Sequence, residues 1–120
     1  MKIKLATINL EVADPQTSKR FYISALDMTE NLKLSHPPAF VYLQSAGGDL
    51  TLAKPRKAVA AEPSRTMELG FEVDDLAALQ TRFTELGISG FQPQSMSWGD
   101  ALEGHDPDGH RLIVYSFKRE

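Results

Sequence analysis

The sequence predicts an α+β fold made of two similar halves, each a strand, a helix and three further strands. The first observation is a pattern of apolar residues that changes from a period of two to a helical period at the same point in each half. The second is a short signature that recurs at half the length of the chain, which indicates two copies of one supersecondary unit. It reads Glu11-Val12-x-Asp14, Arg20-Phe21 and Leu26-Asp27-Met28, then Glu72-Val73-x-Asp75, Arg82-Phe83 and Leu86-Gly87-Ile88, at offsets of 61, 62 and 60 residues.

The first half begins with a strand within residues 3–12, where Ile8, Leu10 and Val12 alternate with polar residues. Asp14-Pro15 then provides an N-cap and a first-turn proline, so we expect a helix that ends near Leu26-Asp27. Three short β-type runs separated by turn residues follow, at 28–34, 40–44 and 50–53.

The second half repeats this order, with alternating apolar residues over 67–73 and a helix capped by Asp74 or Asp75 and ended by Gly87. Its further strands are expected at 91–96, 98–103 and 111–117. Residues 54–65 have no periodic pattern and are expected to form a linking loop. We therefore expect a single domain over residues 1–120, with module one at about 1–53 and module two at 66–120.

Composition excludes several classes of function. Thirteen basic residues against sixteen acidic ones give a net charge of -3 without a block of like charge, so neither nucleic acid nor a membrane is an expected partner. The absence of cysteine excludes disulfides, a thiolate nucleophile and cysteine-bound zinc. The first residues contain no signal-peptide pattern, so a cytoplasmic location is expected.

The segment His105-Asp106-Pro107-Asp108-Gly109-His110 places two imidazoles and two carboxylates within six residues. Asp, Pro, Asp and Gly in this order are typical of a tight turn, because Asp bonds forward, Pro presets φ and Gly accepts positive φ. Two histidines beside a four-residue hairpin loop, without a third ligand, make a poor metal site. We therefore interpret the segment as a turn.

These residues together resemble the vicinal oxygen chelate superfamily, which includes glyoxalase I, extradiol dioxygenases, and fosfomycin and bleomycin resistance proteins. The resemblance rests on Asn9-Leu10-Glu11-Val12-Ala13-Asp14, Phe21-Tyr22, Phe71-Glu72-Val73-Asp74-Asp75-Leu76, and Trp98-Gly99 ahead of Asp106-Pro107-Asp108-Gly109-His110. It implies two βαβββ modules whose curled mixed sheets surround a cup, with helices on the outside, and a homodimer.

The superfamily's metalloenzymes hold a divalent ion with residues on the first and last strand of each module. The resemblance places these positions at Thr7, Glu68, Ile113 and Thr51, or at Leu50 after a slip of one residue. Only Glu68 is a good ligand, whereas tight binding of zinc, nickel or iron needs about three protein donors. We therefore expect no metal site and no cofactor, and we place the histidines, including His36, in loops or at strand ends.

If Thr7 and Glu68 face the cup, the strand period of two places Asn9, Ile113 and Tyr115 on the same side. Leu10, Leu69, Leu112 and Val114 then face the helices. The cup would be largely apolar, as pockets for organic ligands are, and Trp98 could stack on a planar guest. Trp98 could equally fill the core or an interface, and the sequence leaves open whether Phe40 and Tyr42, or Val41 and Leu43, face inward.

We therefore predict metal-independent sequestration of a small aromatic or cationic organic molecule, closest to the bleomycin-resistance branch. The predicted ligand-binding residues are Thr7, Asn9, Phe40, Tyr42, Glu68, Trp98, Ile113 and Tyr115. The alternative is a lyase, isomerase or dioxygenase of the same superfamily that uses a metal, or Glu68 as a base with a pKa raised by burial. A third reading is a partner-binding module whose cup is filled by its own side chains.

Overall fold

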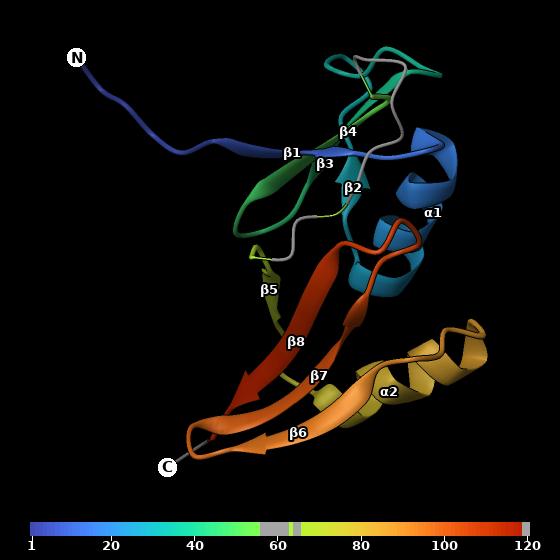
Figure 1. Cartoon of the computed structure of the whole chain (residues 1–120). Coiled ribbons are helices and arrows are strands. Elements are labelled where there is room, and N and C mark those ends of the chain that lie inside the picture. The colour runs from blue at the N-terminus through green and yellow to red at the C-terminus, as the bar shows by residue number, and fades with distance from the viewer. Residues whose placement is uncertain (56–62, 64–65, 119–120) are drawn as a thin grey trace. The chain divides into compact units, whose positions relative to one another are not determined.

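The chain forms two compact units, Met1–Glu62 and Pro63–Glu120, with the same arrangement of strands and one helix each (Figure 1). The structure is a computed structural model and describes residues 1–55, 63 and 66–118. The predicted α+β class and the two βαβββ modules are confirmed. Most of the predicted linking loop at 54–65 lies outside the described residues.

Module one contains one helix and a mixed four-stranded sheet in the order β1-β4-β3-β2. Strand β1 pairs in parallel with β4, and the remaining neighbours pair antiparallel. Its elements are β1 (Thr7–Glu11), α1 (Pro15–Leu26), β2 (Thr29–Glu30), β3 (Phe40–Gln44) and β4 (Asp49–Ala53).

Module two repeats this topology, with the order β5-β8-β7-β6 and a parallel pair formed by β5 and β8. Its elements are β5 (Leu69–Glu72), α2 (Leu76–Glu85), β6 (Gln92–Met96), β7 (Gly99–His105) and β8 (Arg111–Phe117). The repeat extends to single hydrogen bonds. The Val12 N–H donates to the Ala53 carbonyl at 2.9 Å, and the Val73 N–H donates to the Tyr115 carbonyl at 2.8 Å.

Both helices begin at the predicted aspartates. Asp14 accepts hydrogen bonds from the Gln16 N–H at 3.0 Å and the Thr17 hydroxyl at 2.9 Å. These bonds, that of Thr17 foremost, lower the pKa of the Asp14 carboxyl. In module two the N-cap is Asp75, which accepts from the Ala78 N–H at 3.0 Å. The helix ends also match the prediction, with Asp27 and Gly87 in left-handed conformations at φ 56° and 72°.

Each helix covers one face of its own sheet, which we call the covered face; the opposite face is the open face. Helix α1 packs on β3 and β4, and α2 packs on β8. The predicted alternation is confirmed, because the residues expected to face the helices are buried or half-buried. The buried residues of the covered faces are Leu10, Val41, Leu43, Leu50 and Leu52 in module one, and Leu69, Leu102, Leu112 and Val114 in module two.

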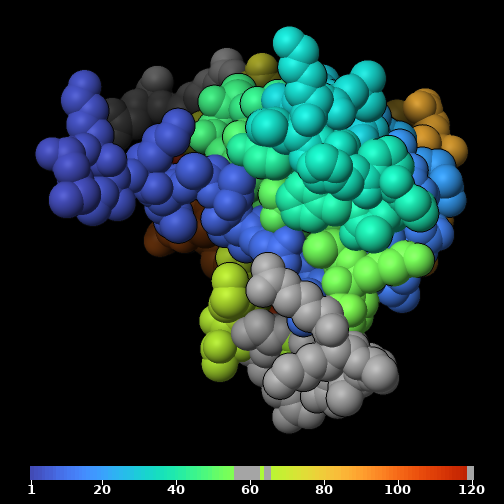
Figure 2. Space-filling model, turned by 90° about the horizontal axis from the view of Figure 1, so that it is seen from above, coloured from blue at the N-terminus to red at the C-terminus, as the bar shows by residue number. Residues whose placement is uncertain are grey.

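Two predicted strands are shorter than expected. Residues 3–6 form no strand and lie exposed ahead of β1, where the chain projects from module one (Figures 1 and 2). The run at 28–34 is a strand only at Thr29–Glu30. The Asn31 side chain accepts from the Leu34 N–H at 3.1 Å and its carbonyl from the Ser35 N–H at 3.1 Å, so the chain turns there instead.

The segment His105–His110 is the predicted turn. Asp106 is buried, and its Oδ1 accepts from the N–H groups of Asp108 and His110, both at 2.9 Å. Gly109 has φ 87° and donates to the Asp106 carbonyl at 3.0 Å. His105 ends β7 and His110 precedes β8, as expected for residues that flank a hairpin loop.

The cap of α2 provides a direct test of the fold. Asp75→Ala removes the acceptor for the Ala78 N–H and should lower the free energy of unfolding by about 1 kcal/mol. The neighbouring Asp74→Ala is the matched control, because Asp75 provides the N-cap. Chemical denaturation of both variants checks this, and equal losses of stability would contradict the assignment of the cap.

Candidate functional site

The open faces hold most of the residues predicted to bind a ligand. Thr7, Asn9, Phe40 and Tyr42 lie on the open face of module one. Ile113 and Tyr115 lie on that of module two, Trp98 lies in the turn before β7, and Glu68 lies just ahead of β5. The two sets belong to different units.

Polar side chains form a row across the open face of module one. Asn9, Thr51 and Tyr42 are direct neighbours on β1, β4 and β3. The Thr51 hydroxyl donates to Asn9 Oδ1 at 2.7 Å, and the Tyr42 hydroxyl donates to Asp49 Oδ2 at 3.0 Å. Thr51 and Asp49 are two residues apart on one strand and so share a face. We call Asn9, Tyr42, Asp49 and Thr51 the polar row.

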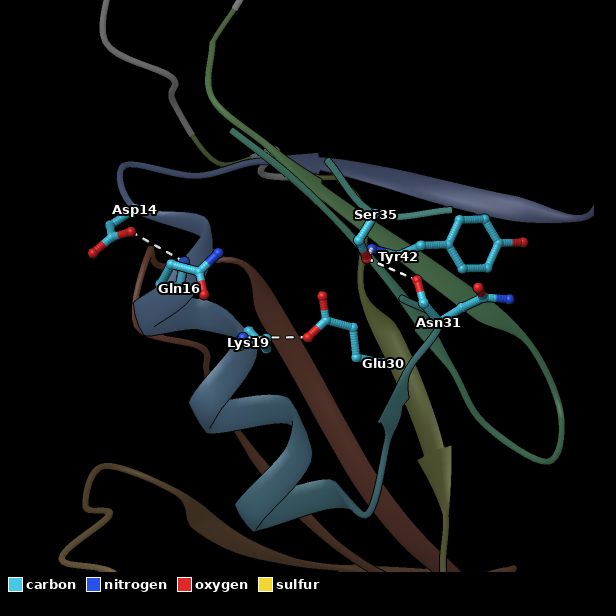
Figure 3. A network of polar contacts seen from close by, with 7 residues as sticks. All are labelled: Asp14, Gln16, Lys19, Glu30, Asn31, Ser35 and Tyr42. Atoms are coloured by element: carbon cyan, nitrogen blue, oxygen red, sulfur yellow. Dashed lines mark hydrogen bonds and ion pairs between the residues drawn. The ribbon is translucent and has the colours of Figure 1, made fainter. Parts of the chain in front are cut away.

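The orientation of β3, which the sequence left open, is clear. Val41 and Leu43 are fully buried on the covered face, so Phe40 and Tyr42 occupy the open face. Figure 3 shows the Tyr42 ring on the side of the sheet away from α1, whereas Glu30 points toward α1 and pairs with Lys19 at 3.2 Å. The Tyr42 N–H donates to the hydroxyl of Ser35, a residue of the connection between β2 and β3, at 2.9 Å (Figure 3). This hydrogen bond fixes the backbone of Tyr42.

The Asp49 carboxylate changes the acidity of Tyr42. The hydrogen bond from the phenol to Asp49 raises the Tyr42 pKa above its usual value, and burial and the negative charge of Asp49 act in the same direction. The neutral phenol is therefore the form that the folded protein favours. The hydrogen bond to Asp49 therefore adds to the free energy of unfolding below the ordinary pKa of tyrosine. This contribution is lost as the pH rises through the raised pKa of Tyr42.

Module two has an aromatic open face. Trp98, Tyr115 and Phe117, which we call the aromatic cluster, meet edge to face in all three pairs, with ring centroids 5.2 to 5.7 Å apart. Trp98 is 39% exposed and Phe117 is 54% exposed. Neither side chain is buried in the core, and together they present apolar surface to solvent. The exposed Glu72 lies opposite Tyr115 on the same face.

Two glycines allow close packing beside the aromatic cluster, Gly99 for the backbone of β8 and Gly70 for the Tyr115 ring. A Cβ atom at Gly99 would overlap the Ser116 carbonyl oxygen, so only glycine allows β7 to approach β8 directly after Trp98. The Trp98 carbonyl accepts from the Lys118 N–H at 2.8 Å, which closes this end of the sheet. On β5, the Tyr115 ring reaches over Gly70, where a Cβ atom would lie 3.4 Å from Tyr115 Cε1.

Glu68 differs from the expectation of a buried carboxylate. Its side chain is 30% exposed, and Oε2 lies 3.3 Å from Nη2 of Arg111. Sequence reasoning missed Arg111, although the alternation of β8 places it on the same face as Ile113. The hypothesis that Glu68 acts as a base required burial among Ile113 and Tyr115. The structure instead leaves Glu68 partly exposed.

The four positions that the resemblance assigns to a metal do not form a good ligand set. Thr51, rather than Leu50, shares the open face with Asn9, and Ile113 pairs with Gly70 at the equivalent place in module two. Two hydroxyls, an isoleucine and a carboxylate paired with arginine do not match the donors that zinc, nickel or iron require. Over residues 1–55, 63 and 66–118, no three His, Asp or Glu side chains group as metal ligands would.

Acidic residues outnumber basic ones on the described strands of the open faces. Among the strand residues of the two open faces that the structure describes, the acids are Glu11, Asp49, Glu72 and Glu103. The one lysine or arginine there is Arg111, which pairs with Glu68. Asp49 and Glu103 were missed as site residues. The signal that could have found them is the strand register, in which Glu103 lies opposite Ile113 and Asp49 lies opposite Gln44, two residues from the partner of Tyr42.

The raised pKa of Tyr42 leads to a spectroscopic prediction. In an alkaline titration of the folded protein, the phenolate absorbance step of Tyr42 should occur above the usual range for tyrosine. Asp49→Asn should move that step toward the usual value, because the carboxylate acceptor and its charge are lost. Tyr42→Phe should abolish the step, which assigns it, and an unchanged titration curve in Asp49→Asn would contradict the assigned cause.

Comparisons with known proteins agree with this architecture. Among solved structures of similar fold are a lactoylglutathione lyase from Agrobacterium tumefaciens (TM-score 0.72, 21% identity, 94% of this chain and 92% of that chain) and a glyoxalase-related enzyme from Fulvimarina pelagi (0.72, 23%, 94% and 87%). A glyoxylase/bleomycin resistance protein/dioxygenase domain from Frankia sp. EAN1pec is also similar (0.72, 22%, 99% and 94%). At these identities the likeness shows the fold alone.

A comparison with curated proteins finds no match. No described helix is long and apolar enough to cross a membrane. The sequence model of the Glyoxalase/Bleomycin resistance protein/Dioxygenase superfamily matches residues 4–114, nearly the whole chain. The chain therefore belongs to the Glyoxalase/Bleomycin resistance protein/Dioxygenase superfamily.

Proposed function

We propose that this protein binds and sequesters a small aromatic or cationic organic molecule without a metal ion, as bleomycin-resistance-like proteins of the superfamily do. A cytoplasmic location and a homodimer are part of this proposal. The observation that carries it is the aromatic cluster, which places two partly exposed large rings on an open sheet face.

The cluster has the properties of a binding surface for a ring. Its three side chains support one another edge to face, so they are held in place before a ligand arrives. Contiguous exposed apolar surface often marks a site where a ligand or a partner binds. Glu72 lies beside the rings and favours a guest with positive charge, which an aromatic face also attracts.

The donor set supports a function without metal. Of the four positions that the superfamily's metalloenzymes use, this chain has Thr7, Thr51 and Ile113 at three. The fourth, Glu68, already pairs with Arg111. A set with one carboxylate and no imidazole does not offer the donors that a tightly bound divalent ion needs.

Binding at the cluster can be measured directly, because Trp98 is the only tryptophan of the chain. Titration with a panel of aromatic compounds and cationic glycopeptides should change its fluorescence for at least one member. Phe117→Ala should weaken that binding roughly threefold to tenfold through loss of ring contact. Leu32→Ala, which removes an exposed apolar residue of module one, is the control. Silence across the panel would contradict the proposal.

An enzymatic function is the second candidate, favoured by the names of two solved structures of similar fold, a lactoylglutathione lyase and a glyoxalase-related enzyme. In this chain a lyase, isomerase or dioxygenase would depend on Glu68, as a proton-transfer base or as one ligand of a metal. In either role Glu68 must first leave Arg111, whose Nη2 lies 3.3 Å from its Oε2.

Metal analysis distinguishes the two candidates. Protein purified without chelator should contain far less than one zinc, nickel or iron ion per chain, and added metal should leave the thermal unfolding temperature unchanged. One tightly held ion per chain, lost in Glu68→Gln, would instead favour the enzyme. Thermal unfolding of Glu68→Gln without metal is the control for a purely structural effect on the Arg111 pair.

A further inference from the structure

The hydrogen bonds of the polar row have a fixed direction. The Tyr42 hydroxyl uses its hydrogen on Asp49 Oδ2 at 3.0 Å, so its oxygen can only accept a further bond. The Thr51 hydroxyl uses its hydrogen on Asn9 Oδ1 at 2.7 Å, and its oxygen is likewise left with acceptor capacity alone. Asp49 has no hydrogen to donate as a carboxylate. These three groups therefore present only acceptors to a ligand.

The three groups are also close together. Tyr42 and Thr51 are direct cross-strand partners, and Asp49 lies two residues from Thr51 on the same face of β4. Directly opposed side chains start about 5 Å apart, so one small group can reach more than one of these oxygens. Thr51 is buried and Tyr42 and Asp49 are half-buried, which reduces the screening of the Asp49 charge by water.

Among the residues of β1, β3 and β4, no lysine or arginine shares the open face with Asp49. The other open-face residues of β1, β3 and β4 are Thr7, Asn9, Glu11, Phe40, Tyr42, Gln44, Thr51 and Ala53, and none is basic. An ion pair of module one, between Lys19 and Glu30, lies on the side of α1 (Figure 3). The partner that fits a group of acceptors with one negative charge is a positively charged donor of several hydrogen bonds.

We infer that Asp49, Tyr42 and Thr51 form a subsite on module one for a protonated amine or amidine of the ligand, with Asp49 as the group that selects the charge. The inference rests on the proposed binding function and adds the chemical class of the group recognised. It concerns residues of module one alone. Phe40, on the same open face, can contact the apolar part that carries the amine.

The test compares two probes that share a benzyl group and differ in the group it carries, benzylamine with a protonated amine and benzyl alcohol with a neutral hydroxyl, on the full chain at neutral pH. Binding is followed by amide chemical shifts in NMR spectra, which also locate each probe. Benzylamine should bind about fivefold more tightly than benzyl alcohol, as expected for a partly exposed ion pair, and should shift the amides of β3 and β4. Asp49→Asn should reduce the ratio of the two dissociation constants to about one without weakening benzyl alcohol.

Two controls isolate the carboxylate. Tyr42→Phe keeps Asp49 and should retain most of the preference for benzylamine. Glu85→Gln removes the same charge from the exposed end of α2 and should leave the ratio unchanged. The amide spectrum of each variant reports its fold, and the location of the shifts in the unaltered protein stands even if Asp49→Asn does not fold.

The outcomes separate the two proposals. Equal binding of both probes, or shifts of the amine confined to module two, overturns the inference and leaves the proposed function standing. If neither probe binds and the panel of aromatic compounds and cationic glycopeptides leaves the Trp98 fluorescence unchanged, both the inference and the proposed function are overturned.

Discussion

Each module has one helix for a sheet with two faces, and this constraint organises the rest of the molecule. A helix can cover only one face, so the alternation of a strand separates residues that build the core from residues that remain available. Leu10, Leu52 and Val41 form a cross-strand row beneath α1, whereas Asn9, Thr51 and Tyr42, one position away, form the polar row. The same strands thus provide both stability and a candidate binding surface.

The two copies of the unit keep their backbone and differ on their open faces. The hydrogen bond from Val12 to Ala53 has its equivalent in that from Val73 to Tyr115, so Thr51 and Ile113 are equivalent positions. Thr51 contributes a hydroxyl to the polar row, whereas Ile113 is apolar and lies two residues from Tyr115 of the aromatic cluster. Helix caps and covered faces must stay similar because they hold the fold, whereas the open faces can change chemically at little cost in stability.

Most of the fold could be predicted from local patterns. Aspartate caps, left-handed residues at helix ends and the Asp106–Gly109 turn depend on neighbouring atoms, and each was found where the sequence placed it. The failures occurred where a partner strand or a competing turn decides. Residues 3–6 have strand-like alternation and form no strand, and Asn31 ends β2 by bonding the following backbone.

The sequence by itself determined the class of fold, the repeat, the helix boundaries and the separation of buried from open positions, because these follow from contacts within a few residues and from the period of two. Only the tertiary structure decided that Tyr42 rather than Val41 lies on the open face. It also decided that Tyr42 bonds Asp49 and that Glu68 pairs with Arg111 across 43 positions. A pattern of alternation specifies two sides without saying which side a helix covers. Packing of α1 on Val41 and Leu43 supplies that choice, and the pairing of distant strands brings together charges that the sequence keeps apart.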